Sequence, residues 1–239
     1  EELDVSRFST SKVFNTSKMF QFMNNVKRID VSNFVTSMVR DMSFMFHHCK
    51  SVTSLDVSRF ITNKVTNMES FFDDCEEITD LNVLNFDTSL VTSFSRMFAT
   101  CKKLRSLDVH NFRTPSATDM SYMFQSCNSL TSLDVKSFNT SLVTSMENMF
   151  AATNITKLDL SNFDTKKVTT MMMMFQGNQN LESLDISKFD TSKVTDMYAM
   201  FDDNRKLKQL NLNSFTTENC LDMSAMFRRC SSLSTLPDI

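Results

Sequence analysis

The sequence predicts an α/β solenoid, a right-handed and horseshoe-shaped coil with one parallel sheet of about ten short strands and short helices on the opposite face. One motif restarts every 26 residues along the chain, with a single step of 25 from Leu133 to Leu158. Each unit first alternates apolar and polar residues and then changes to a helical spacing. Such units bury their apolar faces only by stacking. The motif starts at Leu3, Ile29, Leu55, Leu81, Leu107, Leu133, Leu158, Leu184, Leu210 and Leu236.

The unbroken period predicts that residues 1–239 form one domain of about nine repeats, since no linker or low-complexity segment interrupts it. We expect the chain to be cut from a longer protein; a shortened or idealised sequence is the alternative. The net charge of -3 gives no overall basic field for nucleic acid or anionic lipid. No apolar run approaches the ~18 residues of a membrane span, so no direct membrane insertion is expected.

Positions in the unit are counted from its first Leu. Positions 1 to 4 alternate apolar and polar residues, as in Leu133 to Lys136. This period of two is typical of a short strand with one buried face. Because the strands recur once per unit, they are expected to stack in parallel. Phe fills positions 6 and 18 of all nine complete units and is assigned to the core.

Positions 14, 17, 18 and 21 have the spacing of one helical stripe, for example Met120, Met123, Phe124 and Cys127. Position 13 always holds Ser, Thr, Asn or Asp, which can cap a helix. We therefore predict a helix of about two turns in each repeat, partly 3₁₀. The Met residues are interpreted as core, apart from Met172 and Met173, which are expected to be exposed.

Position 8 is Thr in every complete unit and is interpreted as a structural turn residue, with a water-ordering array as the alternative. Five of the six Cys occupy position 21, which also accepts Asn, Thr and Met, so it predicts a small buried pocket and neither a disulfide nor zinc. His47 and His48 are placed in solvent. No acid, base and nucleophile are nominated together, so no enzyme, cofactor or metal is expected.

Position 2 is Asp or Asn in every complete unit, between inward-facing residues at positions 1 and 3. A file of carboxylates one rung apart is unfavourable unless something offsets the repulsion. Ser, Thr and backbone N–H groups on adjacent rungs can do this, and so can a cation or a basic partner. Both explanations are kept, and the first is preferred.

Positions 26 and 4 flank the acidic file and vary from unit to unit, so recognition is placed there. Position 7, with Val35, Ile61, Asp87 and Arg113, is a second variable strip at the rim. The predicted binding face consists of Arg28, Asp30, Ser54, Asp56, Asp80, Asn82, Leu84, Ser106, Asp108, His110, Ser132, Asp134, Lys136, Lys157, Asp159, Ser183, Asp185, Gln209 and Asn211.

The motif L-D-V-S-x-F-D-T-S-x-V-T-x-M-x-x-M-F-x-x-C-x-x-L resembles the BspA-like leucine-rich repeat surface proteins with 25- or 26-residue units. The stretches from Leu158 to Met171 and from Leu184 to Met197 are nearest to this pattern. The first unit departs from it with Thr16 and Met23, and the last with Cys220. The resemblance implies a leucine-rich-repeat solenoid at the cell surface with a role in adhesion or host-protein binding, and it carries no catalytic residues.

We therefore expect a non-catalytic, extracellular adhesion module that binds a protein or glycan through its sheet face, on host or neighbouring cells. The alternatives are a structural spacer that displays another domain and a cation-binding or ice-like array on the Asp or Thr file. Nucleic acid is not expected as a partner. The first and last rungs are unpaired sheet edges, so end-to-end self-association is an additional expectation.

Overall fold

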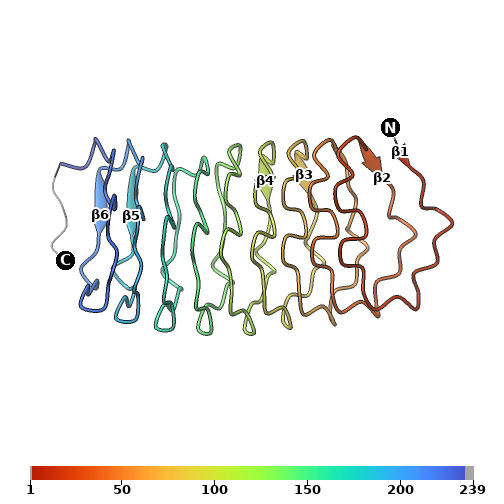
Figure 1. Ribbon diagram of the computed structural model, residues 1–239, viewed down its shortest axis with the longest axis horizontal. Helices are drawn as coiled ribbons and strands as arrows, with labels where there is room; N and C mark the ends of the chain where they lie inside the picture. Colours follow the sequence, from red (N-terminus) through yellow and green to blue (C-terminus); the bar gives the residue numbers. More distant parts are fainter. Residues whose placement is uncertain (1, 235–239) are drawn as a thin grey trace.

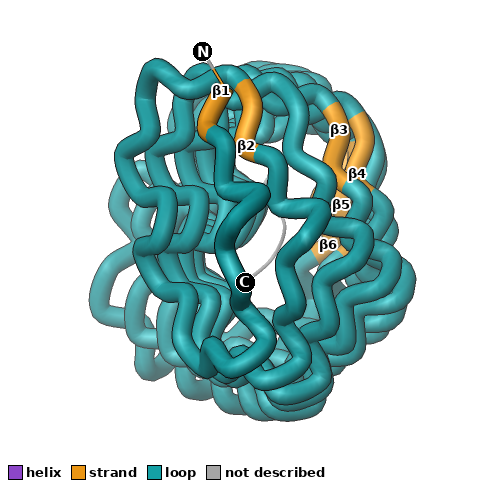
Figure 2. Tube along the Cα trace, turned by 90° about the vertical axis from the view of Figure 1, so that its right-hand side faces the viewer, coloured by secondary structure: helices purple, strands orange, loops and turns teal. Residues whose placement is uncertain are grey.

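The chain forms a continuous row of stacked rungs, as predicted for a solenoid. The computed structural model describes residues 2–234, so the tenth motif start at Leu236 lies outside the described residues. Figure 1 shows the rungs side by side along the long axis, with the two ends of the chain at opposite ends of the row. Figure 2, viewed along that axis, shows the rungs one behind another. The row is nearly straight in Figure 1, and the predicted horseshoe curvature stays a prediction.

The strands are shorter than predicted and do not form one sheet. They pair in parallel, one repeat apart, in three two-stranded sheets, β1 with β2, β3 with β4 and β5 with β6. The predicted single sheet of about ten strands is therefore wrong. The strands are β1 (Glu2–Leu3), β2 (Arg28–Ile29), β3 (Asp80–Leu81), β4 (Ser106–Leu107), β5 (Ser183–Asp185) and β6 (Gln209–Asn211).

The strands lie at positions 26 and 1, and extend to position 2 in β5 and β6, because side-chain and turn hydrogen bonds occupy the N–H groups from position 4 onward. In the second repeat, the N–H of Ser32 donates to Oδ1 of Asp30 at 3.0 Å. Two residues later, the N–H of Phe34 donates to the carbonyl of Val31 at 3.0 Å. These N–H groups are unavailable to a neighbouring rung, so the strand ends.

Residues 2–234 contain no helix, so the predicted α component is wrong, and no helix in this range could cross a membrane. In the fifth repeat, the N–H of Met123 donates back to Met120 at 3.3 Å, which closes a turn. The next N–H, of Phe124, donates to Met149 on the following rung at 3.0 Å. Tyr122 and Ser126 have positive φ, which interrupts any helix. Overlapping turns thus replace the helix.

The side chain at position 13 accepts a backbone N–H group, as it would at the start of a helix, although no helix follows. Oδ1 of Asp119, for example, accepts the N–H of Ser121, two residues later, at 2.8 Å. The same positions form parallel bridges from each rung to the next, from Asn15 to Asp222. The capping residue types were therefore recognised correctly, but they organise a turn and hold neighbouring rungs together.

The core is a set of files, each built from one position of the repeat. The Phe rings at position 18 stack from Phe20 to Phe227 with centroids 5.5–5.9 Å apart. The Met residues at positions 14 and 17 are buried through most of the chain, as expected. Met172 and Met173 are half-buried, whereas exposure was predicted.

Polar side chains inside the solenoid connect one rung to the next. At position 8, the hydroxyl of Thr114 donates to the carbonyl of Asn139 and accepts its N–H, both at 2.9 Å. Because this Thr file is buried, it has the structural role that was preferred and is not a water-ordering surface. At position 21, the thiol of Cys127 donates to the carbonyl of Phe98 on the preceding rung at 3.1 Å. All six Cys are free thiols.

Replacement of Thr114 by Val should destabilise the fold by about 2–4 kcal/mol, because the buried hydroxyl of Thr114 bonds both the N–H and the C=O of Asn139 and valine bonds neither. Thr118→Val is the matched control, since exposed Thr118 makes one inter-rung side-chain bond, to Thr92, and should cost under ~1 kcal/mol. Urea unfolding of both variants measures the difference. Equal losses would contradict the role assigned to position 8.

Candidate binding face on the strand side

The predicted binding residues lie on the strand side of the solenoid and are accessible. Asp30 and Asn211 are half-buried, and the others are exposed. They belong to positions 26, 2 and 4, so they form parallel files beside the buried residues at positions 1 and 3. The structure divides these residues between two hollows and the surface outside them.

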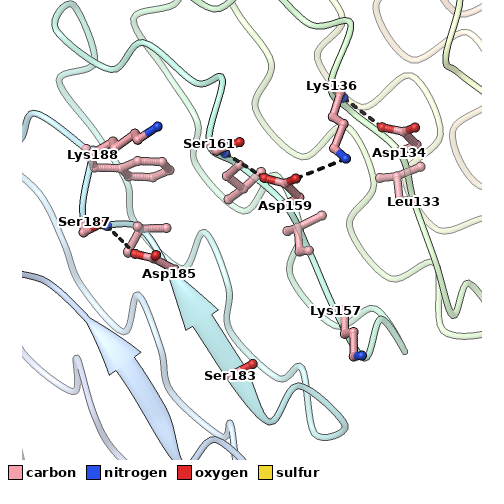
Figure 3. A pocket seen from close by; sticks show the side chains of 14 residues that line it. Leu133, Asp134, Lys136, Lys157, Asp159, Ser161, Ser183, Asp185, Ser187 and Lys188 are labelled. Atoms are coloured by element: carbon pink, nitrogen blue, oxygen red, sulfur yellow. Dashed lines mark hydrogen bonds and ion pairs between the residues drawn. The ribbon is translucent and has the colours of Figure 1, made fainter.

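Two neighbouring hollows occupy the middle of the strand side, with volumes of about 470 and 550 Å³, and both include Leu133, Asp134 and Lys157. Figure 3 shows the first of them. Its predicted residues are Asp134, Lys136, Lys157, Asp159, Ser183 and Asp185. Those of the second are Asp80, Asn82, Leu84, Ser106, Asp108, Ser132, Asp134 and Lys157. Outside both lie Arg28, Asp30, Ser54, Asp56, His110, Gln209 and Asn211.

The two hollows adjoin the one shortened repeat. The 25-residue step ends at Leu158, which is half-buried, whereas Leu133 and Leu184 on either side of it are buried. Within the described residues, the strand side has no pairing between the rungs from β4 to β5, or between Ser54 and β3, whereas the position-13 bridges continue past both places. Removal of one residue shifts the register of the backbone groups that pair in other rungs. The stretch of the strand side without such pairing is longest here, over the three steps from β4 to β5.

Each side chain of the position-2 file is held by its own rung. In all nine complete units, its Oδ1 accepts the N–H two residues later at 2.9–3.3 Å. The expected explanation by local hydrogen bonding is correct in kind, although the donors lie in the same rung and not on adjacent rungs. Among residues 2–234, no three His, Cys, Asp or Glu side chains are grouped to hold a metal.

These hydrogen bonds stabilise the charged form of the carboxylates. Hydrogen bonding by Ser161, followed by Lys136, lowers the pKa of Asp159 to about 2. Hydrogen bonding by Ser187 likewise lowers the pKa of Asp185, and hydrogen bonding by His110 lowers that of Asp108. The lowered pKa values keep Asp108, Asp159 and Asp185 ionised at neutral pH.

Lysines border the first hollow on both sides of the carboxylate file (Figure 3). Nζ of Lys136 lies 3.3 Å from Oδ2 of Asp159 on the next rung. Within the described part of the chain, Lys157 and Lys188 form no ion pair. The carboxylates beside Lys157 and Lys188 already accept backbone N–H groups. The two lysines can therefore bind an anionic group of a partner in the hollow.

Ser161 and Ser187 belong to the predicted position-4 file but were not among the named binding residues, and Lys188 at position 5 was missed; all three line the first hollow. Position 5 gave the missed signal. Where it is Asn, the side chain clamps the preceding rung, as Nδ2 of Asn162 does at the carbonyl of Phe138 at 2.9 Å. Lys188 stands at the same position without this contact and places a cation at the hollow. Lys at position 5 was therefore the signal in the sequence.

On another part of the rungs, the His pair lies against two acids and is not in solvent as predicted. His47 and His48 are half-buried, above the buried Asp73 and Asp74 of the next rung. Nε2 of His47 lies 3.5 Å from Asp73, and His48 contacts Asp74. Burial, then the neighbouring His48, lowers the pKa of His47 to about 4, and burial raises the pKa of Asp73 to about 6.

Fold and face together define a repeat solenoid with an irregular polar surface on its strand side. The family model described as a Mycoplasma protein of unknown function, DUF285, matches residues 1–82, 69–163 and 151–236, and the chain belongs to this family. None of the curated proteins matches the chain.

Two solved structures are similar to the chain at low identity. One is a leucine-rich repeat protein from Bacteroides ovatus, with 18% identity over 92% of this chain and 63% of that one, and a TM-score of 0.41. The other is the functional domain of InlJ from Listeria monocytogenes, which includes a cysteine ladder, with 17% identity over 78% and 55% and a TM-score of 0.27. The chain spans less than two thirds of either.

Asp73→Asn should stabilise the protein at pH 7.5 by about 1–3 kcal/mol more than at pH 4. The folded-state pKa of about 6 exceeds the ordinary value of ~3.9, so ionisation of Asp73 opposes folding increasingly as pH rises through this range. Asp87→Asn is the control, because hydrogen bonding by Ser89 lowers the pKa of Asp87 and the trend with pH should reverse. Urea unfolding at both pH values tests this, and a shared trend would refute the assigned burial effect.

Proposed function

We propose that the protein is a non-catalytic, cell-surface binding module of the BspA-like leucine-rich repeat type, which recognises a protein or glycan through its strand side. The observation that carries the proposal is the contrast between neighbouring files. Positions 1, 2 and 3 repeat nearly unchanged, while positions 26 and 4 beside them differ from rung to rung. A surface that varies on a constant support is suited to selective recognition.

The chemistry of the hollows supports a polar partner with at least one anionic group. Lys157 lies at the junction of both hollows, in a file that otherwise contains Ser at most rungs of this region. Ser161, Ser183 and Ser187 supply hydroxyl groups around the first hollow. Side chains of Leu133, Leu158 and Ile186 line it as well, so a partner gains apolar contact together with hydrogen bonds.

The test returns the variable positions of the middle rungs to the prevailing Ser. A variant with His110→Ser, Lys136→Ser and Lys157→Ser removes the distinctive groups and keeps the files that support the fold. We expect binding to immobilised matrix proteins or to a glycan array to fall at least tenfold, corresponding to ~1.4 kcal/mol, with Tm unchanged.

Lys166→Ser with Lys193→Ser is the matched control, because it removes two exposed cations from positions outside the strand side. Its binding should equal that of the unmodified chain. Full binding by the triple variant would refute the strand side as the recognition surface. If the unmodified chain bound neither protein nor glycan, the spacer function would be favoured instead.

A further inference from the structure

A second surface lies on the turns of the first four rungs, away from the strand side. We call residues 7–15, 33–41, 59–67 and 85–93 the N-terminal edge; they cover positions 5 to 13 of each unit. Six large apolar side chains on it are between 44% and 68% exposed. The five equivalent later turns expose two such side chains, Leu142 and Leu221. The six are Phe8, Phe14, Val35, Met38, Ile61 and Leu90.

The same edge carries a local excess of positive charge that the net charge of -3 conceals. Its two acids, Asp41 and Asp87, accept the N–H groups of Ser43 and Ser89. Within residues 2–234, none of the five cations of the edge takes part in an ion pair. Those cations are Arg7, Lys12, Arg40, Arg59 and Lys64.

Apolar and basic side chains alternate on adjoining rungs, so they belong to one continuous surface. At position 7, Val35 and Ile61 lie on neighbouring rungs, which Thr36 connects through its hydroxyl contact with the N–H of Ile61 at 2.7 Å. At position 10, Nζ of Lys64 lies 3.3 Å from Sδ of Met38. At position 12, the N–H of Arg40 donates to the carbonyl of Phe14 at 2.9 Å.

We propose that the N-terminal edge docks onto a bilayer that contains anionic lipid. Singly exposed apolar side chains between Lys and Arg are suited to the boundary between headgroups and acyl chains, where the cations reach the lipid phosphates. An acidic protein is the other class of partner for such a surface. It is less well matched, because the lining of the hollow beside Ile61 is mostly polar and includes Asp87, whose carboxylate would repel an acidic partner.

This docking does not depend on recognition by the strand side. The N-terminal edge comprises positions 5 to 13 of the first four rungs, whereas the strand side uses positions 26, 2 and 4, together with Lys188 at position 5 of a later rung. No residue belongs to both surfaces. A bilayer can therefore hold the molecule by one surface while the other remains available to a partner.

Co-sedimentation with vesicles tests the proposal on the full chain. The chain should partition onto vesicles of equimolar phosphatidylcholine and phosphatidylglycerol, with little binding to pure phosphatidylcholine, and added salt should weaken binding. Arg40→Gln with Lys64→Gln should lower the partition coefficient roughly 25-fold, since each cation contributes roughly fivefold near an anionic surface. Met38→Ser with Ile61→Ser should lower it by roughly tenfold.

Lys167→Gln with Lys193→Gln is the matched control, since both residues occupy position 10 of later rungs; Leu142→Ser is its apolar counterpart. Both should bind as the unmodified chain does. The proposal fails if the chain ignores anionic vesicles, binds neutral ones equally, or loses as much binding in the controls. Binding of soluble polyglutamate in place of vesicles would favour the acidic protein. Should the Arg40 and Lys64 variant lower Tm, Lys12→Gln with Arg59→Gln must reproduce the loss.

Discussion

Hydrogen bonding between successive rungs is the constraint on which the rest of the structure depends. In the segment from position 14 to position 20, every second N–H donates to the following rung, while the N–H groups between them close turns within their own rung. This division requires positive φ twice per rung, at residues as bulky as Phe44 and Tyr122. Each such residue costs about 1–2 kcal/mol. Stacking repays this cost only collectively, because a single rung has no partner for those N–H groups.

The sequence was sufficient to predict most inward side chains but not the backbone that carries them; the prediction was wrong for Phe8 of the first rung, which is exposed. The spacing of Met120, Met123, Phe124 and Cys127 indicates one buried stripe, and all four are buried. Overlapping turns produce the same stripe as a helix, so the spacing cannot distinguish them. The capping residue Asp119 was equally ambiguous, since an Asp caps a helix or a turn by the same contact with an N–H. The residues with positive φ could not be recognised from the sequence either, because only Gly177 among them is a glycine.

The candidate site was predictable as a face but not as a pair of hollows. Comparison of the units identifies the files that vary, and these residues are exposed as expected. The shortened step before Leu158 was also visible in the sequence. The absence of strand pairing over the three steps from β4 to β5 was not visible in it, since the first of these steps has the usual length of 26 residues. Lys188 also lines the first hollow, although it occupies position 5, where Asn162 and other Asn residues bond the preceding rung.

In a solenoid, the charge of each repeat position is more informative than the net charge of the chain, because the net charge hides how the charges are distributed over the surface. The net charge of -3 includes the position-2 carboxylates, which accept backbone N–H groups of their own rungs. It also includes the Lys and Arg of the N-terminal edge, which form no ion pair within residues 2–234. Because each rung contacts only its neighbours, exchange of an exposed residue leaves the Phe and Thr files unchanged. Two surfaces on one solenoid can thus differ in chemistry without competing for the contacts that hold the rungs together. The burial of Thr62 and the exposure of Lys64, in the same turn of the third unit, illustrate this separation.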